Sequence, residues 1–109
     1  MATGAGITID EYELLPAALA RNHELVDGEL VDVSGNTPEH NLLRELLVML
    51  LFPITVEHKV GLIIAEQEFD FGGNAHGPDV ALIGVDRVHL LERKKRVQRF
   101  VPDFAIEIA

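Results

Sequence analysis

The chain has 109 residues, of which 48% are hydrophobic and 25% are charged. This length and composition fit one globular domain and exclude a disordered or collagen-like chain. The longest apolar run, Leu46 to Phe52, stops at Pro53 and falls far short of the roughly 18 residues that a membrane span needs. The segment Met1 to Gly6 lacks the basic and apolar regions of a signal peptide. We therefore expect no contact with membranes.

Charge and cysteine content narrow the function classes further. Because the sequence has no cysteine, disulfides, thiolate zinc sites and cysteine nucleophiles are excluded, and a cytoplasmic location is expected. The net charge of −9 repels a polyanion unless the basic residues gather locally. Residues 86–109 contain six of them, namely Arg87, Arg93, Lys94, Lys95, Arg96 and Arg99. This basic segment either contacts nucleic acid or forms a solvated charged surface.

Two helices are predicted in the first half of the chain. Thr8 to Glu11 fits a capping box, which predicts a short helix from about Ile9 to Leu15. Thr37, followed by a proline and an acid, predicts the start of a second helix over Pro38 to Phe52. Its leucines repeat at helical spacing, at Leu42, Leu43, Leu46, Leu47, Leu50 and Leu51. We expect this leucine face to be buried and Pro53 to kink or end the helix. In the first case helix resumes until Lys59, and in both cases the chain turns near Gly61.

Strand patterns lie on both sides of the second helix. His23 to Val33 alternates around Asp27-Gly28, which predicts a type I′ hairpin. The two-residue turn places Glu24 on the polar face of this hairpin and Leu25 on its apolar face. Leu62 to Phe71 also has strand periodicity.

Three further segments complete the expected elements. Gly72 to Asn74 predicts a turn, and Val80 to Val85 is an apolar run typical of a strand covered on both faces. Asp86 to Arg96 is expected to form a short helix or turn, and Phe104 to Ile108 a last strand. The sequence thus predicts an α/β (α+β) domain with a sheet and flanking helices.

Two acids occupy unusual places in this pattern. Asp79 stands at the start of an apolar strand, and Glu107 is set into the last one. A buried carboxylate must be paired, protonated or bound to a metal, and two carboxylates brought together would hold a hard cation such as Mg²⁺. In the alternative reading, Asp79 makes a turn after Pro78 and Glu107 lies on a solvent-facing edge. Since no two histidines lie three or four residues apart, a zinc site is not predicted.

The end of the chain suggests association. A predicted core strand reaches almost to Ala109, so we interpret residues 1–109 as a single domain that is cut short at its C-terminus. Its last strand would leave Phe104, Ile106 and Ile108 beside an unpaired edge, which native proteins normally cover. We therefore expect a homodimer or a larger homo-oligomer.

Four segments, in order, carry a resemblance to a known family. They are His23 to Val31, Pro38 to Asn41, Gly77 to Ala81 and Val101 to Ile108. Their order and spacing resemble the Uma2 family (the DUF820 group) of restriction-endonuclease-like proteins through nearly the whole chain.

The resemblance implies a PD-(D/E)xK fold, which is a mixed sheet flanked by helices, and a Mg²⁺-dependent (or Mn²⁺-dependent) DNA endonuclease. Asp79 and Glu107 match the two acids that bind the metal, and Glu24 and His40 match positions near the catalytic site. In that mechanism the metal polarises the scissile phosphate and lowers the pKa of a bound water.

One position departs from the pattern that the resemblance implies. The residue two after Glu107 is Ala109, where the general motif has a lysine. We therefore predict a chain that binds the metal weakly, contacts DNA weakly and cleaves it little or not at all. The alternative is a non-catalytic binding or assembly module that retains the nuclease fold.

Overall fold

The computed structural model describes residues 6–109 and shows a mixed α and β architecture. Residues 1–5, which form most of the segment without signal-peptide features, lie outside the described residues. The helices are α1 (Ile9–Glu13), α2 (Ala17–Ala20), α3 (Pro38–Glu57) and the 3₁₀ turn η1 (Val88–Leu90). The strands are β1 (His23–Val26), β2 (Glu29–Asp32), β3 (Gly61–Ala65), β4 (Glu68–Phe71), β5 (Asn74–His76), β6 (Val80–Gly84), β7 (Val97–Gln98) and β8 (Phe104–Ile106).

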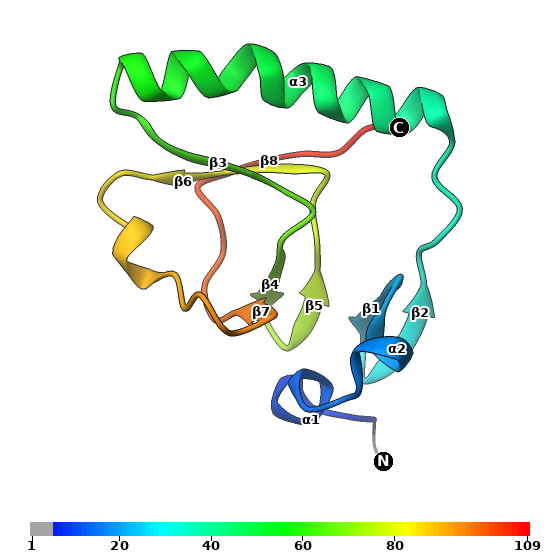
Figure 1. Ribbon diagram of the computed structural model, residues 1–109. Coiled ribbons are helices and arrows are strands. Elements are labelled where there is room, and N and C mark those ends of the chain that lie inside the picture. The colour runs from blue at the N-terminus through cyan, green and yellow to red at the C-terminus, as the bar shows by residue number, and fades with distance from the viewer. Residues whose placement is uncertain (1–5) are drawn as a thin grey trace.

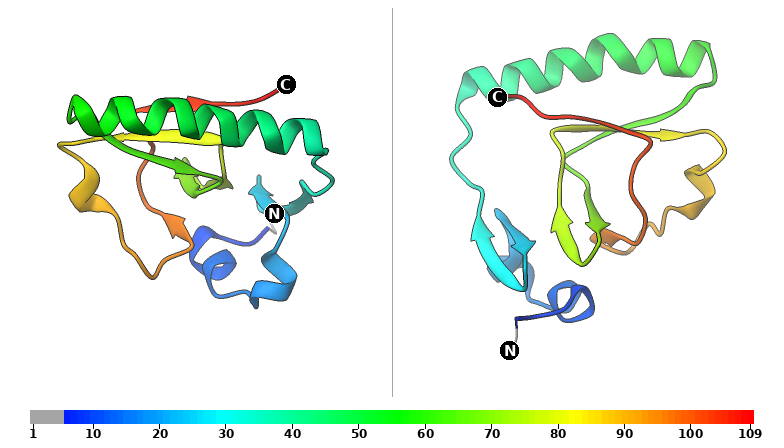
Figure 2. Two further views of the ribbon diagram at one scale, coloured as in Figure 1. Left: turned by 45° about the horizontal axis from the view of Figure 1, so that its top comes forward. Right: turned by 180° about the vertical axis from the view of Figure 1, so that it is seen from behind.

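These strands form a five-stranded sheet of order β2-β1-β5-β4-β7 and a three-stranded sheet of order β3-β6-β8. β4 and β7 run parallel and the other pairs antiparallel, so the larger sheet is mixed, as the predicted fold class requires. α3 extends along the three-stranded sheet, and α1 and α2 lie on the opposite side of the molecule, near the β1-β2 hairpin (Figure 1). The segment after β8 ends beside the first turns of α3 in every view (Figure 2).

The N-terminal elements follow the local sequence signals. Thr8 and Glu11 form the predicted capping box, and the helix ends at Glu13, two residues earlier than expected. In the hairpin, Val26 pairs with Glu29 across a turn whose two residues have φ angles of 49° and 81°. Positive φ at both positions is the type I′ geometry that the Asp-Gly pair predicts.

The run Leu62 to Phe71 forms two strands, so the single strand predicted there is wrong. β3 and β4 are separated by Glu66, which has a φ of 57°, and they belong to different sheets. Their partner strands, β6 and β5, are interrupted at the same position along the pair. The segments β3-β4 and β5-β6 therefore form one antiparallel ribbon that bends from one sheet into the other. The Glu66 N–H donates to the carbonyls of Pro78 and Asp79, both at 3.2 Å, and fixes this bend.

α3 continues through Pro53 to Glu57, so a helix end at Phe52 is wrong, and the alternative of helix beyond Pro53 holds to two residues short of Lys59. A proline inside a helix leaves the carbonyl four residues earlier without its amide partner. That carbonyl belongs to Met49, a residue that is 68% exposed, so water can hydrate it. The chain leaves the helix at His58 and turns before Gly61, as expected.

The predicted burial of the leucine face is wrong as well. Four of its leucines are 44% to 66% exposed: Leu42, Leu43, Leu46 and Leu50. The reason is that α3 packs on β3 and β6 with a neighbouring side, where Thr55 is buried and Leu47 and Leu51 are half-buried. Within residues 6–109 the other four leucines remain exposed.

The core has two parts. The first joins α1 to the larger sheet and contains Ile9, Tyr12, Leu25, Ala75 and Val97. The second lies where the ribbon bends and contains Phe69, Ala81 and Ile83. The complete burial of Leu25 confirms the predicted apolar face of the hairpin.

The last third of the chain is close to prediction. β6 and β8 lie within the two predicted strands, and η1 is the short helical turn expected after Asp86. β7, which has only two residues, was not predicted. None of the helices in the described part of the chain is long and apolar enough to cross a membrane.

Candidate active site

Asp79 lies in the bend of the ribbon, one residue before β6, with a side chain that is 16% exposed. Its Oδ1 lies 2.7 Å from His40 Nε2, and its Oδ2 accepts a hydrogen bond from the Ile108 N–H at 2.8 Å. The bend therefore holds this carboxylate between the first turn of α3 and the segment that follows β8.

Glu107 follows β8 and lies beside Asp79. Its Oε1 accepts from the Asp79 backbone N–H at 3.0 Å, and its Oε2 lies 2.6 Å from His76 Nε2. Because β6 and β8 are adjacent antiparallel strands, the residues just outside their paired ends meet, as the sequence predicted for these two acids.

Glu24 in β1 reaches the same place from the other sheet. Its Oε2 accepts from the Gly77 N–H at 3.0 Å and lies 2.6 Å from His76 Nδ1. β1 pairs with β5, which carries His76, so this contact follows from the sheet order. We call Glu24, His40, His76, Asp79 and Glu107 the carboxylate–imidazole cluster.

His76 bridges two carboxylates and was not predicted as a site residue. Burial alone lowers the pKa of this imidazole, but the hydrogen bonds and charges of Glu24 and Glu107 outweigh burial and raise the pKa above its usual value. An ionised carboxylate on each ring nitrogen requires both nitrogens to donate, which favours the imidazolium. The only signal in the sequence was its position three residues before Asp79.

His40 owes its position to the start of α3. Thr37 is the N-cap, and its Oγ1 accepts from the His40 N–H at 3.2 Å. The cap fixes the first turn, and the first turn directs the imidazole, which is 19% exposed, onto Asp79. The Thr-Pro-Glu signal that predicts the helix therefore also positions a residue of the cluster.

The four sequence-predicted residues, Glu24, His40, Asp79 and Glu107, thus lie in one hydrogen-bonded network drawn from four parts of the chain. In the present arrangement all four carboxylate oxygens of Asp79 and Glu107 have a hydrogen-bonding partner. Within residues 6–109 no three His, Asp or Glu side chains are grouped in a way that would hold a metal ion. The donor set itself, three carboxylates, is of the type that hard divalent cations prefer.

The basic segment is partly consumed by ion pairs inside the molecule. Three of its residues pair with acids: Arg87 with Asp103, Arg96 with Glu68 and Arg99 with Asp10. The other three, Arg93, Lys94 and Lys95, are exposed and form no ion pair with the described residues. Half of the segment thus remains for an external anion.

The chain is similar to known proteins in sequence profile and in fold. The sequence profile of the Uma2 family, described as "Putative restriction endonuclease", matches residues 9–109. A solved structure from Anabaena variabilis ATCC 29413, described as a putative nuclease belonging to DUF820, is similar to the chain with a TM-score of 0.79 and 21% sequence identity. The match covers 94% of this chain and 58% of that one, so the chain spans a little over half the length of its solved relative. No curated protein matches the sequence. The structural similarity confirms the predicted fold class.

Proposed function

The chain belongs to the Uma2 family, and on that basis we propose that it is a metal-dependent DNA endonuclease that hydrolyses phosphodiester bonds. The observation that carries this proposal is the convergence of Glu24, Asp79 and Glu107, with two imidazoles, at the bend between the sheets. Restriction-endonuclease-like families generally use divalent metals, and like-charged carboxylates gathered in one place suit such an ion.

Asp79 and Glu107 are the residues that would hold Mg²⁺ or Mn²⁺. The ion, when bound, supplies Lewis acidity toward the phosphate and a water of lowered pKa. It would take carboxylate oxygens that now face imidazole nitrogens, so His40 and His76 compete with it. We therefore expect weak metal binding.

The chain's own residues orient the acids. The Ile108 N–H and His40 fix the Asp79 carboxylate, and the Asp79 N–H fixes Glu107. His76 offsets the repulsion between Glu24 and Glu107 by standing between them. A carboxylate held by two donors loses little orientational freedom when a ligand arrives, which is the preorganisation that catalysis needs.

Turnover by the 109-residue chain is expected to be low. Ala109 stands where the general motif has a lysine, and loss of one group that stabilises transition-state charge costs about 10² to 10³ in rate. The net charge of −9 also weakens capture of a polyanion, increasingly as salt is raised. Metal binding should therefore survive better than cleavage.

The test is a plasmid-nicking assay with Mg²⁺ and with Mn²⁺ on the chain, Asp79→Asn and Glu107→Gln. Asp103→Asn is the matched control, because Asp103 also accepts a backbone N–H beside β6 but lies outside the cluster. We expect slow nicking that falls at least about 10²-fold in the two cluster variants and is unchanged in the control. Nicking that persists in Asp79→Asn would contradict the proposal.

A second candidate is a non-catalytic binding or assembly module that retains the fold. The exposed apolar face of α3 favours it, because contiguous apolar patches on a surface mark interaction sites. Absence of metal binding, measured by calorimetry on the full chain, together with concentration-dependent association would support this module over the endonuclease.

A further inference from the structure

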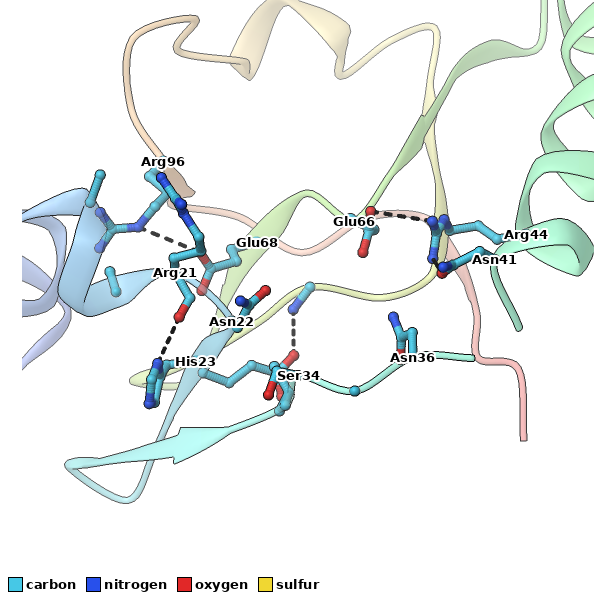
Figure 3. Close-up of a pocket in the computed structure, with 16 residues that line it drawn as sticks. Arg21, Asn22, His23, Ser34, Asn36, Asn41, Arg44, Glu66, Glu68 and Arg96 are labelled. Carbon is cyan, nitrogen blue, oxygen red and sulfur yellow. Dashed lines mark hydrogen bonds and ion pairs between the residues drawn. The ribbon is translucent and has the colours of Figure 1, made fainter. Parts of the chain in front are cut away.

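A polar pocket with a volume of about 560 Å³ opens beside the carboxylate–imidazole cluster. Its walls come from α2, β1, the loop of residues 33–36, the first turns of α3 and the bend of the ribbon (Figure 3). Glu24 and Gly77 belong both to this pocket and to the cluster network. A ligand in the pocket would therefore lie next to the acids proposed to hold the metal.

The size of the pocket limits what can enter it. Cavities of roughly 300–1,000 Å³ take small organic ligands, a range that includes one nucleotide. A nucleotide within a B-form duplex is paired and stacked, so it would have to leave the stack to enter such a cavity. Only an unpaired nucleotide of a strand could occupy it.

Arg44 is the residue best placed to bind the phosphate of such a nucleotide. Its side chain is 12% exposed, and its Nη1 donates to Asn41 Oδ1 at 3.1 Å, which holds the guanidinium in place (Figure 3). Its acidic partner, Glu66, lies 3.6 Å away and is 57% exposed. A loose pair with an exposed carboxylate is easily exchanged for a phosphate, which the guanidinium binds through two parallel hydrogen bonds.

Arg44 also has the right relation to the cluster. It follows His40 by four residues on α3, so the two side chains leave the same face of the helix one turn apart. His40 contacts Asp79, while Arg44 lines the pocket. A phosphate on Arg44 would thus lie next to the site where the acids would hold the metal.

Three other charged groups inside the pocket are already engaged. Arg96 pairs with Glu68 at 3.5 Å, stacks over the Tyr12 ring at 4.7 Å and donates to the Tyr12 carbonyl. Glu68 also accepts from the Tyr12 hydroxyl at 2.6 Å, and Glu24 is held by His76. Arg21 is exposed at the rim. Arg44 therefore carries the charge that an incoming anion can most easily reach inside the pocket.

The remaining polar lining suits a base. Four uncharged side chains that can both donate and accept hydrogen bonds surround the cavity: Asn22, Ser34, Asn36 and Asn41. Such amides pair with base edges, as asparagine does with adenine in DNA complexes. The combination of one available guanidinium and several amides fits a nucleotide better than free phosphate.

We propose that this pocket is a subsite for one unpaired nucleotide of the DNA strand, with its phosphate on Arg44. The inference rests on the proposed function and narrows it, because it predicts that the endonuclease prefers single-stranded or gapped DNA to continuous duplex. Continuous duplex would contact the surface without filling the pocket.

Binding is measured in EDTA, so that cleavage plays no part. Fluorescence anisotropy compares a 20-nucleotide single strand, the same sequence as a duplex, and the duplex with a two-nucleotide gap. We expect the single strand and the gapped duplex to bind at least about tenfold more tightly than the continuous duplex, which corresponds to one good phosphate or base contact. Equal binding of all three would overturn the proposal.

The matched variants are Arg44→Gln, Arg44→Lys and Lys59→Gln. Arg44→Gln and Lys59→Gln each remove one positive charge, but Lys59 is exposed after the end of α3, outside both the pocket lining and the basic segment. We expect Arg44→Gln to weaken single-strand binding about tenfold, Arg44→Lys to weaken it less, and Lys59→Gln to change it slightly. Equal losses in the two glutamine variants would show that only net charge matters and would overturn the assignment.

A second variant guards against misfolding, because Arg44 also ties α3 to Glu66. Asn36→Asp adds a negative charge to the exposed loop at the pocket without altering the helix, and it should weaken single-strand binding as well. Thermal unfolding of each variant shows whether it is folded. Nicking without nucleotide binding in the pocket would support the endonuclease and refute the subsite. Nucleotide binding in the pocket without nicking would support the subsite and refute the endonuclease.

Discussion

The two ends of β6 are built alike and yet differ in charge. Asp103 precedes β8 and accepts from the Gly84 N–H at one end, and Glu107 follows β8 and accepts from the Asp79 N–H at the other. We call the Gly84 side the far end and the Asp79 side the near end. At the far end one arginine, Arg87, lies 3.1 Å from the carboxylate and completes the arrangement.

The near end contains more charge than the same structural task requires. Glu107 alone would suffice to accept the backbone N–H, as Asp103 does, but Asp79, Glu24 and two imidazoles are added to it. Repulsion among gathered carboxylates opposes folding unless something else retains them. A carboxylate at the end of a strand can thus be purely structural, as Asp103 is. The additional acids and imidazoles at the near end are the groups for which we propose a function.

The largest loss of stability, which should affect both ends of β6, is expected from Ile83→Ala. Ile83 is completely buried in β6 between the two ends and packs in the second core. Truncation of a buried isoleucine costs about 2–5 kcal/mol of unfolding free energy. Urea unfolding followed by circular dichroism checks this value, and a loss below about 1 kcal/mol would show that the two ends do not depend on a common core.

A smaller effect, confined to the far end, is expected from Gly61→Ala. Gly61 opens β3 opposite Gly84, and a Cβ there would lie 2.1 Å from the carbonyl oxygen of Ile83. The strand must shift to relieve that contact, so we expect a loss of about 1–3 kcal/mol. The imidazole NMR signals of His40 and His76 report on the near end. They should stay unchanged, and a shift in them would show that the ends are mechanically coupled.

Leu46→Ala tests the helix that supplies His40 to the near end. Because Leu46 is 52% exposed, its truncation should change the unfolding free energy of the monomer by less than about 0.5 kcal/mol.

We also propose that the leucine face, with the edge strand β8 and its exposed Phe104, drives self-association. Light scattering over a wide concentration range should show a dimer or larger species that Leu46→Glu weakens. A monomer throughout would remove this proposal.

Sequence reasoning succeeded where the deciding contacts are local. The capping box at Thr8 and the Asp27-Gly28 turn each settle their own conformation within four residues. The meeting of Asp79 and Glu107 was also predictable, since an acid in an apolar strand must find a partner and the family resemblance matches both acids to one metal site.

It failed where the outcome depends on distant neighbours. Periodicity along α3 identifies a leucine face but does not reveal what covers it, and Pro53 is tolerated because Met49 faces water. The turn at Glu66 could not be recognised from the sequence, because glutamate rarely adopts the positive φ that this turn requires. His76 was missed because β5 has only three residues, too few for an alternating pattern to appear.

The smallest expected effect is the loss of the stability that Asp103 contributes at the far end when the pH is lowered. The backbone N–H of Gly84, followed by the Arg87 side chain, lowers the pKa of Asp103 below its usual 3.8. Below 3.8 the unfolded chain therefore takes up this proton before the folded one does, so the stability that Asp103 contributes is present above that pH and is lost as the pH falls through the folded-state pKa. Asp103→Asn should be less stable than the parent near neutral pH and should approach it as the pH falls below 3.8. Urea midpoints of the parent and of Asp103→Asn at several pH values measure the difference in stability. A difference that stays constant down to pH 2 would show that the charge of Asp103 does not contribute to stability.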